Sequence, residues 1–254
     1  MTKIILSADS TCDLGDELKA KYQVHYYPFH IILGDKQYQD NVDITPEEIF
    51  QAYWERKILP KTAAIGVGEY LDYFRKWVEN GSQVIHLNLG SGISSAYQNC
   101  CMAARELGNV FPINSGNLSS AIGLLVVEAG KRISQGMPAP QIQKEIQELT
   151  AKCHGSFVLD TLEFLHAGGR CSAVAALGAN LLVQYTRDKL MNRDDLNLDR
   201  CFLVNAGISK ERLNLVKKTI EECADFEHIY ITKASCTISC HCGPNTLGVM
   251  FLTK

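Results

Sequence analysis

Short apolar runs alternate with amphipathic helical segments over residues 1–152, and this alternation restricts the fold more than any other feature of the sequence. The runs have the length of strands, and the segments between them carry apolar residues three or four positions apart, as helices that cover a sheet do. The predicted strands are 3–8, 24–33, 83–89 and 110–113, with a return strand 36–39 after the turn Gly34-Asp35. The predicted helices are 14–21, 46–57, 68–80, 119–135, 140–152 and one that ends at 107. The alternation predicts an α/β fold whose first sheet is mostly parallel, with helices on both faces.

The pattern changes after residue 152. A short strand at 157–159 is followed by the break Gly168-Gly169, an alanine-rich helix that ends near Val183 and a polar stretch over 186–200. Two strands, 201–204 and 228–232, then flank a helix at 209–223, and 249–252 is a plausible last strand. With 254 residues available, we predict two α/β domains, 1–152 and a smaller one at 153–254.

The charge balance excludes several classes of partner. Lys and Arg total 25 against 28 Asp and Glu, a formal charge of -3, whereas nucleic-acid grooves select for clustered basic residues. A basic face on the helix 209–223 is expected to be solvated, although a transient membrane contact or docking to an acidic protein stays open. No apolar run reaches the length of a membrane span and no signal peptide is recognisable, so we expect a cytoplasmic protein whose ten cysteines are reduced.

Common catalytic signatures are missing from the sequence. There is no His-Glu-x-x-His pair and no glycine-rich loop followed by Lys-Ser/Thr, and Gly66-Val67-Gly68 lacks the third glycine of a dinucleotide fingerprint. Ser91 follows a predicted strand, but Leu89 stands where a nucleophile elbow needs glycine. A serine hydrolase is therefore not expected.

Hydroxyl-bearing loops follow three of the predicted strands, at the sheet edge where open α/β sheets bind ligands. They are Asp9-Ser10-Thr11, Gly90-Ser91-Gly92-Ile93-Ser94-Ser95 and Asn114-Ser115-Gly116. Each serine could simply cap a helix, but three such loops together favour a site for a small anion, held by hydroxyls and helix N-terminal amides.

A second reading starts from Cys236, Cys240, His241 and Cys242, which could ligate a metal. If this segment is a strand, Cys240 and Cys242 would share one face and His241 the other, so the groups would not converge on one ion. Buried thiols that pack as small hydrophobes are the preferred interpretation, with a metal- or thiol-dependent enzyme acting on a small anion as the alternative. Six further histidines lie on apolar or amphipathic segments and are expected to be structural: His25, His30, His86, His154, His166 and His228.

Six short motifs occur in the order found in one protein family. They are Asp9-Ser10-Thr11-Cys12-Asp13-Leu14, Tyr38-Gln39-Asp40-Asn41-Val42-Asp43-Ile44, Pro60-Lys61-Thr62, Ser91-Gly92-Ile93-Ser94, Gly168-Gly169-Arg170 and His241-Cys242-Gly243-Pro244. Over essentially its whole length the chain resembles DegV-type fatty-acid-binding proteins. The resemblance implies two α/β domains with one long-chain fatty acid between them, its tail in an apolar tunnel.

The resemblance also implies roles for particular residues. Thr62 and the loop residues Ser91, Gly92, Ser94 and Ser95 would bind the carboxylate. Arg170 and His241 would lie near it and face a fatty acid kinase, which forms an acyl phosphate for phospholipid synthesis. We expect no metal, no cofactor and no catalysis by the isolated chain.

Overall fold

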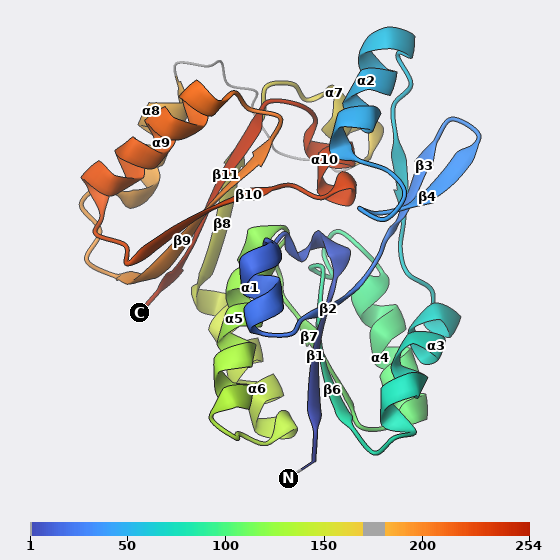
Figure 1. The fold of residues 1–254 in the computed structure, drawn as a ribbon. Helices are drawn as coiled ribbons and strands as arrows, with labels where there is room; N and C mark the ends of the chain where they lie inside the picture. Colours follow the sequence, from blue (N-terminus) through green and yellow to red (C-terminus); the bar gives the residue numbers. More distant parts are fainter. Residues whose placement is uncertain (1, 170–180) are drawn as a thin grey trace.

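A four-stranded parallel sheet forms the centre of the first half of the chain (Figure 1). The structure is a computed structural model, and it describes residues 2–169 and 181–254. In sheet order, the strands are β2 (His25–Tyr27), β1 (Ile4–Asp9), β6 (Gln83–Asn88) and β7 (Val110–Asn114). The predicted parallel sheet is confirmed, and the carboxyl ends of β1, β6 and β7 share one edge.

Helices cover both faces of this sheet, as predicted. On one face lie α3 (Val67–Val78) and α4 (Ala96–Leu107), and on the other lie α5 (Ser120–Ser134) and α6 (Ala139–Leu149), with α1 (Asp16–Lys21) beside α5 (Figure 1). Every residue of α5 from Ser120 to Val127 is buried. A helix that is apolar on all sides must be covered on all sides, so α5 needs a second partner besides this sheet.

A second, mixed sheet is that partner. Its strands, in order, are β10 (His228–Lys233), β9 (Leu196–Ala206), β11 (Thr246–Thr253) and β8 (Cys153–Val158). β9 and β10 are parallel, whereas β11 runs antiparallel to both of its neighbours. The helices of this half are α7 (Glu163–Ala167), α8 (Leu181–Leu190), α9 (Lys210–Cys223) and α10 (Cys236–Cys242). α5 contacts β8, β9 and β11.

Alternate residues of β9 and β11 face opposite sides of this sheet. Cys201 and Phe251 belong to the apolar cluster with residues of α8 and α9, whereas Phe202 and Met250 belong to the larger cluster that includes α5. The second sheet is therefore covered by α8 and α9 on its outer face and by α5 on its inner face.

No helix or strand is predicted within the polar stretch 186–200, but the end of α8 and the first residues of β9 occupy it. Over residues 182–190 of α8, the buried residues are Leu182, Thr186 and Leu190, spaced four positions apart, and Thr186 is polar. Such a narrow stripe gives little helical signal. Most of the predicted alanine-rich helix lies outside the described residues.

A small antiparallel sheet lies beside the first one. It contains β4 (Lys36–Gln39), β3 (His30–Leu33) and β5 (Lys61–Ala63), and α2 (Pro46–Arg56) stands between β4 and β5 in the chain. The single strand predicted at 24–33 is wrong: β2 and β3 join different sheets, and Pro28, which lacks an N–H, lies between them. β5 pairs with β3, with Thr62 opposite Ile31.

The two larger sheets draw their strands from either side of residue 152, but α2, β3 and β5 contact α10 across that boundary. The domain division 1–152 and 153–254 stays a prediction. Among the helices of the described residues, none combines the length and the apolar character needed to cross a membrane.

Candidate functional site

A cavity of about 350 Å³ opens between the inner face of the second sheet, α10 and the loop that precedes α4. Its volume lies in the range of small-molecule sites. Most of its lining side chains are apolar: Phe29, Ala64, Leu89, Ile93, Leu118, Phe157, Leu165, Val204, Ala206, Ala234, Ile238, Cys242 and Met250. Such a lining fits a ligand with a large apolar part.

Four of the residues implied by the resemblance line this cavity: Thr62, Ser94, Ser95 and His241. The Thr62 hydroxyl and His241 Nε2 are 2.8 Å apart, although the two residues are 179 positions apart in the chain. Pairing with β3 fixes the backbone of Thr62, and α10 carries His241. The fold therefore brings together two residues that the sequence could associate only through the family resemblance.

The N-terminus of α4 also faces the cavity. Ser95 occupies the N-cap position, and Ser94 Oγ accepts a hydrogen bond from the backbone N–H of Ala96, at 3.2 Å. Asn99, in the first turn of α4, donates to the carbonyl of Ile65 at 2.8 Å and so ties this helix to the segment that follows Thr62. Helix N-terminal amides and hydroxyls attract an anion without a basic side chain.

Ser91 and Gly92 do not line the main cavity. Ser91 braces its own loop, since its N–H donates to Asn114 Oδ1 at 3.0 Å and its hydroxyl accepts from Asn114 Nδ2 at 2.8 Å. Gly92 lines a smaller adjoining cavity of about 210 Å³. Arg170 lies outside the described residues. A role for these three residues in ligand binding stays a prediction.

The cysteine-rich segment forms a helix, α10, and not the strand on which the geometric argument against a metal site depends. Two buried carboxylates from the first half of the chain bind the N-terminal amides of this helix: Asp13 accepts from the N–H of Ser235 at 2.9 Å, and Asp40 from that of Cys236 at 2.8 Å. Side-chain oxygens that accept from these N–H groups cap the helix, so the reason for a helix here lies in contacts with the first half of the chain. Both aspartates belong to the quoted motifs, but nothing in the sequence pairs them with residues about 200 positions away.

Burial raises the pKa of Asp13 to about 8, even though the hydroxyl and amide donors around it favour the charged form. Burial also raises the pKa of Asp40, which accepts from the Ser10 hydroxyl at 2.7 Å. Ser10 in turn accepts from the N–H of Phe29 at 3.1 Å. The first hydroxyl-bearing loop is therefore used to join elements rather than to line the cavity.

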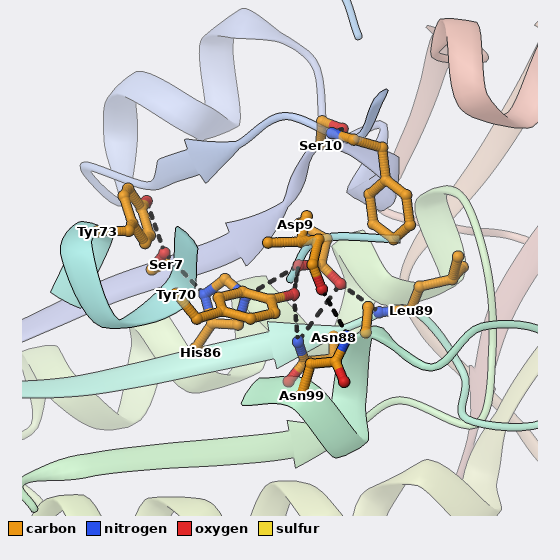
Figure 2. Close-up of polar contacts among 12 residues, drawn as sticks. Ser7, Asp9, Ser10, Tyr70, Tyr73, His86, Asn88, Leu89 and Asn99 are labelled. Carbon is orange, nitrogen blue, oxygen red and sulfur yellow. Dashed lines mark hydrogen bonds and ion pairs between the residues drawn. The ribbon is translucent and has the colours of Figure 1, made fainter. Parts of the chain in front are cut away.

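Figure 2 shows a second buried network, centred on Asp9. Asp9 accepts from Tyr70 at 2.7 Å and from the backbone N–H of Leu89 at 2.8 Å, and it lies 3.0 Å from His86 Nε2. The other ring nitrogen of His86 lies 2.9 Å from Ser7 Oγ. Both nitrogens of this fully buried histidine are thus used within the core, as expected of a structural residue. The network fixes Leu89, where the loop that lines the cavity begins.

The thiols of the cysteine-rich segment are buried. Among residues 2–169 and 181–254, no three His, Cys, Asp or Glu side chains gather in a way that could hold a metal ion. Burial raises the pKa of the Cys236 and Cys240 thiols and raises that of Cys242 to about 12, so these thiols are protonated at neutral pH.

Comparisons with known proteins agree with this fold. Residues 2–183 match the family model DegV, which is described as an uncharacterised protein family. A DegV domain-containing protein of Clostridium perfringens is 31% identical over 190 residues, which cover 72% of this chain and 68% of that protein.

Solved structures with the same fold cover the whole chain. A DegV family protein from Thermus thermophilus, described by its fatty acid binding, has a TM-score of 0.87 at 22% identity, with 100% of each chain covered. The Fatty Acid Kinase (Fak) B3 protein of Streptococcus pneumoniae, loaded with linoleic acid, has a TM-score of 0.84 at 18% identity, again with 100% of each chain covered. By its motifs, its fold and these matches, the chain belongs to the DegV family.

Proposed function

We propose that this protein binds one long-chain fatty acid in the main cavity and presents its carboxylate to a fatty acid kinase. The observation that carries the proposal is the juxtaposition of Thr62 and His241 on the wall of an otherwise apolar cavity. The tail would occupy the apolar part, between the second sheet and the loop that precedes α4. The isolated chain would act as a carrier without catalysis of its own.

The chemistry of the lining supports a fatty acid over a small polar anion. Each buried methylene contributes about 0.8 kcal/mol, so the tail supplies most of the affinity and the head group needs only to be oriented. Hydroxyl donors and the α4 amides can hold one carboxylate oxygen, whereas a bidentate arginine would occupy both. The free oxygen would attack the γ-phosphorus of ATP, the bond to the β,γ-bridging oxygen would break, and ADP would leave as the acyl phosphate forms.

The relatives support the same assignment. The Thermus protein is described by its fatty acid binding, and the Streptococcus protein carries linoleic acid and a fatty acid kinase name. His241 is only partly buried, so a partner can reach the side of the cavity where Thr62 lies.

The test is native mass spectrometry of the purified protein, followed by extraction and identification of any lipid released. We expect one fatty acid per chain, and Thr62→Val should weaken binding of the added acid about tenfold or more, because a hydrogen bond to a charged group contributes about 1.5–3 kcal/mol. Thr253→Val, in β11 but outside the cavity lining, is the matched control. A stoichiometric metal without lipid, or equal affinity of the Thr62 variant and the native protein, would contradict the proposal.

A second arm tests the presentation of the carboxylate. His241→Ala should retain the fatty acid, because the tail holds it, yet should slow acyl phosphate formation in the presence of the kinase and ATP. Bound lipid and acyl phosphate are measured on the same sample. If His241→Ala instead releases the lipid, His241 is a ligand of the head group and not a contact for the kinase.

A further inference from the structure

Two cavities adjoin along the inner face of the second sheet, and the same four residues line both: Ile93, Leu118, Phe157 and Met250. The larger cavity, of about 350 Å³, contains Thr62 and His241. The smaller one, of about 210 Å³, reaches the glycine loops around Gly90 and Gly116. These four residues therefore lie where the two cavities meet.

Met250 has the position and the freedom to move that a partition at this junction needs. It lies on β11 directly opposite Gly155 of β8, and only 2% of it is exposed. A Cβ atom at Gly155 would lie 2.9 Å from Met250 Sδ, and one at Gly248 would lie 2.8 Å from Met250 Cε. The thioether end of Met250 therefore occupies the space above two glycines, where other residues would carry side chains.

This arrangement makes the methionine displaceable. Methionine is unbranched and has three rotatable side-chain bonds, so it adapts to irregular space at low cost. Gly248 lines the larger cavity and Gly155 the smaller, so the thioether lies where the two meet. If the side chain rotates, its thioether end can move into the free volume of one of the two cavities.

We propose that Met250 is a movable partition that sets the length of acyl chain the protein accepts. This inference rests on the proposed fatty acid function. A shorter tail would end against the thioether within the larger cavity. A longer tail would have to displace Met250 and continue into the smaller cavity, so Met250 would select against it.

The test uses the full chain, stripped of lipid and incubated with an equimolar mixture of saturated acids of 14, 16, 18 and 20 carbons. The bound acids are extracted and quantified. Met250→Ala joins the two cavities, and we expect the bound ratio of the 20-carbon to the 16-carbon acid to rise about tenfold or more. That change corresponds to burial of about two additional methylenes.

Two controls separate the partition from general effects on packing. Met250→Leu nearly conserves volume and should leave the ratio within about twofold of the native value. Met102→Ala removes a methionine that is 56% exposed and should change nothing. If Met250→Ala does not fold, Met250→Val keeps a residue suited to a strand while it removes the thioether end.

The outcomes distinguish this inference from the proposed function. If the native protein binds none of the acids, the fatty acid function itself is wrong. If the native protein binds them but Met250→Ala and Met250→Val leave the length distribution unchanged, or shift it to shorter acids, the partition is refuted and the fatty acid function stands.

Discussion

Ser119 combines backbone strain with a buried hydrogen bond. Its φ of 57° and ψ of −147° lie in a region that side chains other than glycine rarely adopt, and it is 1% exposed. Its hydroxyl donates to Asp13 Oδ2 at 2.5 Å, and the residue also lines the main cavity. The bond to Asp13 thus holds a strained backbone at the start of α5.

This strain predicts an unusual order of stability for two variants. Ser119→Ala loses the hydroxyl and keeps the strain, whereas Ser119→Gly loses the same hydroxyl but relieves the strain, which costs about 1–3 kcal/mol at such positions. We expect both variants to be less stable than the native protein, with the glycine variant more stable than the alanine variant by about 1 kcal/mol. Urea unfolding measures this difference, and an alanine variant of equal or higher stability would refute the assignment of strain.

α10 depends on carboxylates that lie far away in the chain. Asp13 and Asp40 bind its first amides, while its last turn carries His241 to Thr62. The helix has only seven residues, too few to be stable by itself in water. The two aspartates therefore set the position of His241 in the site.

The raised pKa of Asp13 predicts how stability depends on pH. Because burial raises its pKa from 3.8 to about 8, the folded state favours the protonated carboxyl. The resulting stabilisation is complete below about pH 3.8 and is lost as the pH rises to about 8. Asp13→Asn keeps a neutral side chain of similar shape, so the stability of the native protein relative to this variant should fall between pH 5 and pH 8.

Urea unfolding at several pH values between 5 and 8 measures that difference. Asp72→Asn, which alters an exposed carboxylate on α3, is the matched control and should leave the pH dependence unchanged. The free energies of unfolding of the native protein and of Asp13→Asn could instead differ by the same amount at every pH. That result would show that the folded protein does not favour the protonated Asp13 carboxyl.

The elements that could be predicted from the sequence are those whose signal is local. Strands β1, β6 and β7 of the first sheet and its flanking helices have apolar periodicities that indicate strand or helix, and they lie close to the predicted ranges. α10 and β5 could not be predicted, because the first is stabilised by Asp13 and Asp40 and the second by pairing with β3. The local sequence contains neither cause.

For the same reason, only part of the candidate site can be predicted from the sequence. Thr62 and His241 were identified through the family resemblance, and the structure places them in contact. The bracing of Ser91 by Asn114 and the position of Met250 over two glycines are products of packing between distant segments. Contacts between distant segments leave no periodic pattern in the amino-acid sequence.

The cavity is walled by both halves of the chain, from Phe29 to Ser119 on one side and from Phe157 to Met250 on the other. A ligand in it would contact both halves and bind the folded state alone. Removal of the fatty acid should therefore lower the unfolding temperature. Saturation at about 100 times the dissociation constant contributes about 2.7 kcal/mol, and each kcal/mol corresponds to about 2–4 °C in a chain of this size.

Calorimetry before and after removal of lipid, and again after fatty acid is restored, measures this shift. A six-carbon acid serves as the control, since its short tail buries few methylenes and should restore little of the stability. Equal unfolding temperatures with and without a long-chain acid would mean that the acid does not bind preferentially to the folded chain.

β11 is the last strand of the second sheet to be synthesised, so it determines when the cavity can form. The strands of the first sheet are complete by residue 114, so that sheet can form while the ribosome is still making the rest of the chain. β11, residues 246–253, lies between β9 and β8 and supplies part of the cavity wall. Until these residues emerge from the ribosome, β8 has no neighbour in its sheet and the cavity lacks the part of its wall that β11 supplies. Under the proposed function, lipid loading would therefore follow translation, and a chain stalled before residue 246 would have a folded first half and an incomplete cavity.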